Sequence, residues 1–338
     1  MRVRRPPSSA AARVTGSGVR SSGPARGALC VAATLVCAGC FSRSTFWLED
    51  AGRSCAAELG PACVDATFGQ GGLFARDVGA VNNVSWSCQA MDIQPDDRVI
   101  LGGMAGPTTD SALVAVRLED DGNLDPSFAE AGVATVDLGT SNDETKVVRM
   151  LADGRILLAA ERRDPSGGTV AAGLARLLPS GLLDASFGTG GIELIDEGAD
   201  RDIINGAVVL ADGSVRVSGQ HRQPTSIFDL QVRGLLSDGA PDPSFGAGGV
   251  MSIDWFGSEE FGGCIIAGPE GTLLVPGDAY RTGPSFDFAL ARVLADGSLD
   301  PTFADSHNLP GRIATDFYGD SDFCNAVAPQ AGGKSVCG

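Results

Sequence analysis

The stretch Leu294-Ala-Asp-Gly-Ser-Leu-Asp-Pro-Thr-Phe303 sets the architecture of the chain, because close copies of it recur. Each copy ends in a phenylalanine three residues after an aspartate. The phenylalanines lie 60, 59, 58 and 58 residues apart, at Phe68, Phe128, Phe187, Phe245 and Phe303. Self-similarity at a fixed period of this length is typical of proteins built from stacked structural repeats.

Each repeat contains four short hydrophobic segments separated by turns. Between Phe187 and Phe245 the predicted strands cover residues 191–196, 206–210, 215–219 and 229–236. Asp-Gly joins the second strand to the third, which is a strong hairpin signal because both turn residues must tolerate positive φ. No segment between the strands has the period and length of a helix. Four antiparallel strands per repeat predict an all-β fold, a β-propeller with five four-stranded blades.

Three recurring motifs resemble the delta-60 repeat of bacterial secreted proteins. They are Ser-Phe-Gly-x-Gly-Gly, an Asp-Gly-Arg or Asp-Gly-Lys hairpin, and Ala-Arg-Leu-x-x-x-Gly-x-Leu-Asp. The resemblance covers roughly residues 55–338 and implies a β-propeller, but that family has no general activity to transfer. The last repeat stops after its third predicted strand. Residues 55–60 align with a fourth strand, so we expect the N-terminal segment to complete the last blade.

Composition and charge restrict the partners. Of the 338 residues, 43 % are hydrophobic, and 47 are glycine, which fits a buried core and many strands joined by turns. The formal net charge is −17. Removing residues 1–39, which carry six arginines and no acids, leaves 19 basic residues against 42 acidic ones, or −23. This charge excludes nucleic acid as a partner and favours cations or basic groups.

The N-terminal sequence predicts export. Residues 28–37 form a ten-residue apolar segment, too short for a stable membrane anchor but suited to a signal peptide. The small residues before Cys40 resemble the bacterial lipobox, in which the cysteine is acylated. We therefore predict a signal peptide over 1–39, lipidation at Cys40, a tether over 40–54 and the propeller over 55–338. Phe41, rather than Asp, predicts an outer-membrane or cell-surface lipoprotein; cleavage without lipidation would give a secreted or periplasmic protein.

Six cysteines follow the predicted lipidation site, an even number that permits disulfides in an exported protein. Cys55 and Cys63 are close enough in sequence for a local pair. Cys88, Cys264 and Cys324 occupy one equivalent position in three repeats. Either small buried side chains or bridges between repeats are expected there.

One carboxylate per repeat ends the first predicted strand, at Asp77, Asp137, Asp196, Asp254 and Asp316. If this strand were innermost, the five side chains would gather at the mouth of a channel and could hold a cation such as calcium. The alternative is that each aspartate caps its own turn. No other metal site or cofactor is predicted.

Other polar positions recur with the repeat. Arginines lie eleven residues before the phenylalanine in three repeats and twelve before it in another, and aspartates lie three before it in all five. The residues are Arg117, Arg176, Arg233 and Arg292, with Asp65, Asp125, Asp184, Asp242 and Asp300. A structural ion pair and turn cap repeated in each blade explains this pattern better than a binding site does.

Catalytic motifs are not found. The two histidines, His221 and His307, are expected in loops, and no nucleophile-elbow sequence accompanies them. No catalytic residue is predicted, and the chain is not expected to be an enzyme.

The sequence thus predicts an exported, lipid-anchored module that binds or scaffolds at the cell surface and touches the membrane through its anchor only. The candidate ligands are a protein, a glycan or a cation. One alternative is a glycosidase- or lyase-like propeller enzyme, which needs convergent carboxylates or a metal in a central pocket. Another is a truncated fragment of a longer repeat protein.

Overall fold

The computed structural model describes residues 68–74, 85–107, 110–139, 142–163, 170–195, 202–222, 228–281, 285–304, 309–317, 319–324, 327–330 and 334–337. These residues form strands, turns and one short 3₁₀ helix, η1 (Pro269–Gly271). The same ranges contain no helix that is long and apolar enough to span a bilayer. The predicted all-β fold is confirmed.

Four antiparallel sheets form four blades, and two further strands belong to a fifth. Blade 1 contains β1 (Ser85–Ile93), β2 (Val99–Gly106), β3 (Ala112–Leu118) and β4 (Val133–Val136). Blade 2 contains β5 (Asn142–Met150), β6 (Ile156–Arg163), β7 (Val170–Leu177) and β8 (Ile192–Ile195). Blade 3 contains β9 (Asp202–Val209), β10 (Val215–Arg222), β11 (Phe228–Leu235) and β12 (Val250–Ile253). Blade 4 contains β13 (Glu260–Gly262), β14 (Ile266–Ala267), β15 (Leu273–Tyr280), β16 (Phe286–Val293) and β17 (Arg312–Thr315), and blade 5 contains β18 (Val327–Gln330) and β19 (Lys334–Cys337).

The sequence repeat and the blade are offset by one strand. The short strand after each repeat phenylalanine pairs with the strand before that phenylalanine, as β8 pairs with β7. The Gly-x-Gly-Gly turn reverses the chain, so Gly188, Gly190 and Gly191 all have positive φ. Each repeat therefore finishes one blade and begins the next.

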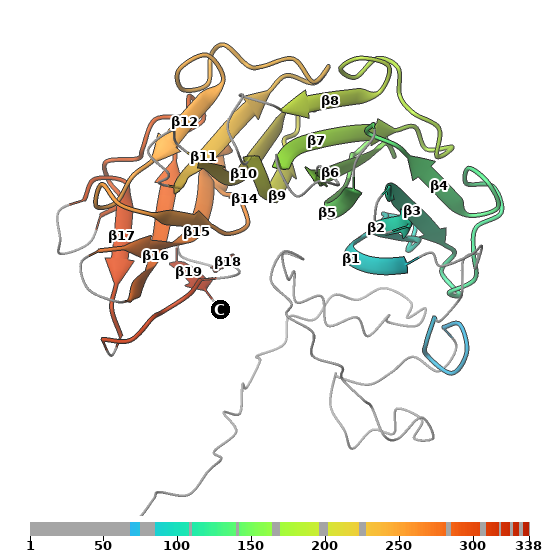
Figure 1. Ribbon diagram of the computed structural model, residues 1–338, viewed down its shortest axis with the longest axis horizontal. Helices are drawn as coiled ribbons and strands as arrows, with labels where there is room; N and C mark the ends of the chain where they lie inside the picture. Colours follow the sequence, from blue (N-terminus) through green and yellow to red (C-terminus); the bar gives the residue numbers. More distant parts are fainter. Residues whose placement is uncertain are drawn as a thin grey trace, which may run out of the picture.

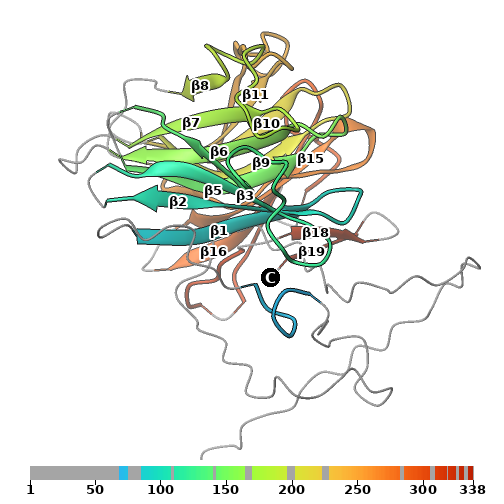
Figure 2. The same cartoon turned by 90° about the vertical axis from the view of Figure 1, so that its right-hand side faces the viewer.

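The blades follow one another around an arc, with their sheets packed face to face (Figure 1). Strands β1, β5 and β9 form the inner edge and contact one another, whereas β4, β8 and β12 lie on the outer side. The side view shows β1, β2 and β3 lying next to one another across the molecule (Figure 2). The short strand after the phenylalanine is therefore the outermost strand of its blade.

The hydrophobic core lies between neighbouring sheets. Ile100 and Leu113 of blade 1 pack with Val148 and Leu158 of blade 2, and similar clusters fill the next interfaces. Each blade thus covers an apolar face of the next, as in other proteins made of stacked repeats.

Candidate functional site

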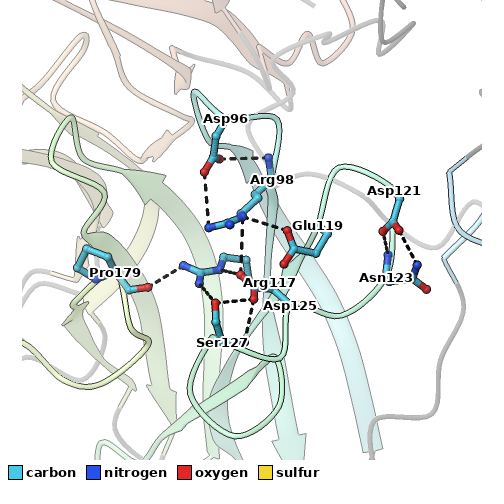
Figure 3. A network of polar contacts seen from close by, with 9 residues as sticks. All are labelled: Asp96, Arg98, Arg117, Glu119, Asp121, Asn123, Asp125, Ser127 and Pro179. Carbon is cyan, nitrogen blue, oxygen red and sulfur yellow. Dashed lines mark hydrogen bonds and ion pairs between the residues drawn. The ribbon is translucent and has the colours of Figure 1, made fainter.

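The recurrent arginines and aspartates form a buried structural network in each blade. In blade 1, the Arg117 Nε donates to the Asp125 Oδ2 at 2.7 Å, and its Nη1 donates to the carbonyl of Pro179 in blade 2 at 2.6 Å (Figure 3). The same guanidinium lies over the ring of Phe128, 4.6 Å from its centroid. The Asp125 carboxylate also caps the turn by accepting from the Ser127 backbone N–H at 2.8 Å. The predicted ion pair and turn cap are confirmed.

This environment fixes the charge of Asp125. Burial alone would raise the pKa of its carboxyl, but the hydrogen bonds from Ser127 and the guanidinium of Arg117 lower it to about 2. Blades 2 and 4 repeat the pair, with 2.7 Å between Arg176 and Asp184 and between Arg292 and Asp300. The network stabilises the blades.

Blade 3 builds the same network from a different strand. Gly234 occupies the position of the arginine, and the guanidinium comes instead from Arg216, directly opposite Gly234 on β10. It forms an ion pair with Asp242 at 2.9 Å and lies 4.7 Å from the centroid of Phe245. Arg233, which the sequence pattern placed in the network, therefore belongs to the other face of the sheet.

The described members of the predicted carboxylate ring are not brought together. Asp137, Asp254 and Asp316 are exposed at the ends of the outer strands β4, β12 and β17. Each accepts a hydrogen bond from its own turn: Gly139 N–H at 2.7 Å, Gly257 N–H at 2.5 Å and Gly319 N–H at 2.5 Å. The predicted carboxylate ring required the strand that ends in each aspartate to be the innermost strand of its blade. That strand is the outermost one, so these three aspartates cap turns instead. Asp77 and Asp196 lie outside the described residues, and within the described ranges no group of three or more metal-ligating side chains occurs.

Several other predicted residues lie outside the described part of the chain, namely Cys40, Cys55, Cys63 and His307. The three equivalent cysteines have different states. Cys264 is a buried thiol, as expected for a small core residue, whereas Cys88 is an exposed thiol. Cys324 is buried and disulfide-bonded.

His221 is not the exposed loop residue that the sequence suggested. It lies near the end of β10, and its Nδ1 is 2.7 Å from the Asp202 Oδ1. The side chain of Asp202, at the start of β9, is itself buried. The register pairs the two residues directly across the two strands. The prediction was wrong because β10 extends three residues beyond the predicted strand.

A small hollow of about 20 Å³, room for about one water molecule, adjoins this pair between blade 3 and blade 2. Ala172 and Ile195 of blade 2 form one wall, and Asp202, Gln231 and Arg233 of blade 3 contribute the polar groups. The Arg233 Nη2 donates to the Gln231 Oε1 at 3.2 Å and lies 3.8 Å from the Asp202 Oδ1. The lining thus combines a carboxylate, a guanidinium and an amide, with an imidazole beside it.

Blade 2 has a related pair, Asp143 opposite Arg162, but the groups of Gln231 and Arg233 do not recur in the other described blades. Arg233 lies twelve residues before the repeat phenylalanine, where the other blades have Val116, Ala175 and Ala291. Gln231 lies fourteen before it, where they have Val114, Gly173 and Ala289. His221 is replaced by Ala105, Arg162 and Ala279. Apolar residues or glycine replace Gln231 and Arg233 in blades 1, 2 and 4, so the blade 3 hollow is the candidate functional site.

Comparisons with known proteins agree on the architecture. Residues 94–128, 151–187 and 269–303 match a family described as a domain of unknown function (DUF5122) beta-propeller. Each matched segment starts just before or within the hairpin turn and ends at the repeat phenylalanine. A comparison with curated proteins finds no match.

Solved structures show weak similarity. A protein of unknown function from Dyadobacter fermentans DSM 18053 is 12 % identical, with a TM-score of 0.42, over 64 % of this chain and 72 % of that one. The GH43 endo-arabinanase from Bacillus licheniformis is 14 % identical, with a TM-score of 0.36, over 68 % and 80 %. A protein of unknown function from Bacteroides caccae is 13 % identical, with a TM-score of 0.35, over 73 % and 68 %. Values this low assign no ligand or activity. The three matched repeats, with the blades around them, make this chain an all-β propeller-repeat protein.

Proposed function

We propose that the chain is an exported binding module that holds a small polar ligand in the blade 3 hollow. One observation carries the proposal: blade 3 alone has Gln231, Arg233 and His221 where other blades have small apolar residues at most of these positions. Burying charged and polar groups costs stability unless they are well paired. Other blades of the same repeat pack with apolar residues at the positions of Gln231 and Arg233. Function is therefore the simplest reason for blade 3 to keep polar residues there.

The lining indicates the class of ligand. A carboxylate, a guanidinium and an amide line the hollow, and the His221 imidazole lies beside it. Together these groups offer both donors and acceptors, which suits a ligand rich in hydroxyl groups. The hollow has a volume of about 20 Å³, which is room for about one water-sized group and far below that of typical small-molecule sites. A single hydroxyl group of a sugar unit bound at the surface fits this room, whereas an enclosed cofactor does not.

A glycan array probed with the purified parent chain tests the proposal. The matched variant is Gln231→Ala with Arg233→Ala, which installs the residues of blade 4, Ala289 and Ala291. We expect the parent to bind one class of glycan and the variant to lose at least about 90 % of that signal while keeping its circular dichroism spectrum. Equal binding by both proteins, or no binding by the parent, would contradict the proposal.

The Asp202–His221 pair supports a second candidate, a glycosidase- or lyase-like enzyme. A buried carboxylate on Nδ1 orients an imidazole as a general base or acid. Release of new reducing ends from a bound glycan, abolished by His221→Gln but not by Asp137→Asn at an exposed turn of blade 1, would favour this enzyme. Binding without product release would favour the binding module.

Export and anchoring complete the proposed function. Lipidation of Cys40 would hold the propeller at the outer membrane, with no cofactor and no nucleic-acid partner. Fractionation of cells that express the parent or Cys40→Ala tests this point. We expect the parent in the membrane fraction and the variant released; unchanged partitioning of the variant would rule out the lipid anchor.

A further inference from the structure

A second group of unusual residues lies at the interface of blades 4 and 5. In the register of blade 4, Asp278 of β15 is directly opposite Phe261 of β13 on one side and Phe288 of β16 on the other. Directly opposed residues share a face of the sheet, so the carboxylate lies between two aromatic side chains. The next pair on this face is Tyr280 with Phe286.

Rings from the following loop extend the group. Phe323 lies 6.3 Å from Phe286, and Phe317 lies 5.8 Å from Phe288, both measured between ring centroids. Phe286 also contacts Phe261 at 5.3 Å. Phe317 and Phe323 remain 54 % and 55 % exposed, so one side of the aromatic group is open to solvent.

The Asp278 carboxylate has no cationic partner within the described chain. Its Oδ1 accepts a hydrogen bond from the Cys324 backbone N–H at 2.9 Å, and no described Arg or Lys forms an ion pair with it. Burial raises the pKa of this carboxyl to about 6, as expected for an acid without a nearby positive charge.

Blade 2 shows how the same position is satisfied when a cation is present. Its equivalent of Asp278 is Glu161, which pairs with Arg163 at 2.5 Å and with Lys146 at 3.8 Å. Tyr280 has the same place in β15 as Arg163 has in β6. Gly263 lies as far after Phe245 as Lys146 lies after Phe128. Blade 4 thus keeps the carboxylate, loses both cations and adds aromatic rings.

We propose that Asp278 and the surrounding rings, here called the blade 4 cage, bind the side chain of an arginine or lysine from a basic partner protein. A carboxylate supplies charge complementarity, and aromatic faces attract guanidinium and ammonium groups. Rings of this region already take guanidinium groups from the chain itself: Arg281 lies 5.3 Å from the centroid of Phe256, and Arg222 lies 5.7 Å from that of Phe228. The formal charge of −17 favours a basic partner over an acidic one.

The exposed rings distinguish a protein partner from a lone cation. Phe317 and Phe323 present apolar surface beyond the carboxylate, which an adjoining peptide segment would cover and a small cation would not. This inference concerns blades 4 and 5 and does not depend on the ligand proposed for blade 3.

Titration of the full chain with a fluorescent hexa-arginine peptide tests the proposal. Asp278→Asn keeps the shape of the side chain and removes its charge. Asp137→Asn is the matched control, because it makes the same change of net charge at an exposed turn of blade 1. We expect Asp278→Asn to weaken binding by at least about ten-fold and Asp137→Asn to change it by less than about two-fold. Equal effects of the two variants would show that the peptide responds only to overall charge, and would overturn the proposal.

Two further variants test the aromatic part. Phe288→Leu installs the residue that blade 3 has at this position, Leu230, and Phe323→Ala removes an exposed ring. Both should weaken peptide binding by about three-fold or more, while a tetramethylammonium titration should respond to Phe288→Leu but not to Phe323→Ala. Peptide binding that neither substitution alters would rule out the cage.

Discussion

At the scale of single residues, a guanidinium stacked on a buried phenylalanine connects blade 1 to blade 2 and blade 2 to blade 3. In blade 2 the side chain of Arg176 is 2 % exposed, yet it donates to Asp184 of its own blade and to the carbonyl of Ser237 in blade 3. A buried charge is tolerated only when it is paired and fully hydrogen-bonded. Blades 1 and 2 meet this condition by providing the carboxylate, the ring and a carbonyl of the next blade at equivalent positions.

In blade 3 the arginine of the network lies on β10, as Arg216, and glycine lies opposite it on β11, as Gly234. This difference from blade 2 offers a direct test of the network. Arg216→Leu leaves the buried Asp242 without its cation, and removing one partner of such a pair costs about 3–5 kcal/mol. Adding Gly234→Arg to Arg216→Leu restores the residue pair that blade 2 has at Leu157 and Arg176. Phe245 has to shift to accept it, because a Cβ atom at Gly234 would lie 2.7 Å from the Phe245 Cβ. We expect the double variant to unfold in urea at a higher concentration than Arg216→Leu alone. A double variant that is less stable than the single one would show that blade 3 cannot accept the arginine on β11.

The charge state of Glu260 should make stability depend on pH. Its side chain is fully buried, its Oε2 has no described hydrogen-bond partner, and burial raises the pKa of its carboxyl from 4.5 to about 8. Between these values the folded protein binds more protons at this group than the unfolded chain does. The free energy of unfolding therefore falls as the pH rises from about 4.5 to 8.

Glu260→Gln removes this titration. Each pKa unit corresponds to about 1.4 kcal/mol, so the variant should gain on the order of a few kcal/mol relative to the parent at pH 8 and little at pH 4.5. Thermal melting across this pH range measures the difference, with the exposed Glu130→Gln as control. If the melting temperatures of the parent and Glu260→Gln changed in parallel with pH, Glu260 would be shown to stay charged in the folded protein.

Spacing along the sequence was enough to predict the Arg117–Asp125 type of pair, because both residues keep a fixed distance from the phenylalanine. It could not predict that Arg216 replaces the arginine in blade 3, since that depends on which residues oppose each other across two strands. The Asp202–His221 pair was missed for the same reason. The signal that was available was internal: comparing the four blades position by position would have singled out Gln231 and Arg233.

At the scale of elements, the hairpins were predicted from their Asp-Gly turns, but the role of the short strand after the phenylalanine was not. Periodicity shows that residues 192–195 form a strand, yet it does not show that the strand pairs backward with β7. The carboxylate ring failed on this point alone.

The inner strands β1, β5 and β9 share a register shift, and in blades 1 and 3 a glycine on the neighbouring strand lets the backbones approach closely. The register of β9 shifts by one residue opposite Ser218 and Gly219. A Cβ atom on Gly219 would lie 1.8 Å from the carbonyl oxygen of Ile203, so the two backbones can approach only because no side chain intervenes. Blade 2 has Ala160 at the equivalent position, with its own shift between Thr145 and Val147.

Gly219→Ala should therefore destabilise the protein far more than Ala160→Gly does. The first substitution forces backbone movement and is expected to cost at least a few kcal/mol. The second relieves no clash and should cost about 1 kcal/mol through backbone entropy and a lost methyl contact. Urea unfolding of both variants beside the parent measures this difference. Similar losses in the two would show that β9 can shift freely around a side chain.

At the scale of the whole molecule, one backbone hydrogen bond recurs between successive blades. The residue after each phenylalanine donates to a carbonyl in the next hairpin turn: Ala129 to Ser180, Gly188 to Asp238 and Gly246 to Asp296, at 2.6–2.7 Å. Gly69, which follows Phe68, donates in the same way to Asp121 of blade 1 at 2.7 Å. The Phe68 turn therefore contacts blade 1 just as the turn of a preceding blade contacts its neighbour.

That preceding blade must be blade 5 if the ring closes. In every other repeat the phenylalanine turn follows the third strand of a blade, as Phe128 follows β3. Blade 5 contains β18 and β19. Residues 55–60 align with the fourth strand of a sequence repeat, which is the third strand of a blade, and would provide the next strand. Residues 55–63 lie outside the described part, so closure by this segment stays a prediction.

Deleting residues 41–63 while keeping the rest of the chain tests this closure. A closed ring has no free sheet edge, and an exposed edge strand is a template for aggregation. If 55–60 pair with β19, the deletion exposes that edge and removes an apolar face from blade 5, so the variant should aggregate or melt many degrees below the parent. Deleting only 41–54, the predicted tether, should leave the melting temperature unchanged. A 41–63 deletion that stays monodisperse and melts like the parent would show that the segment is only a tether and that the Phe68 turn docks on blade 1 without a closed blade 5.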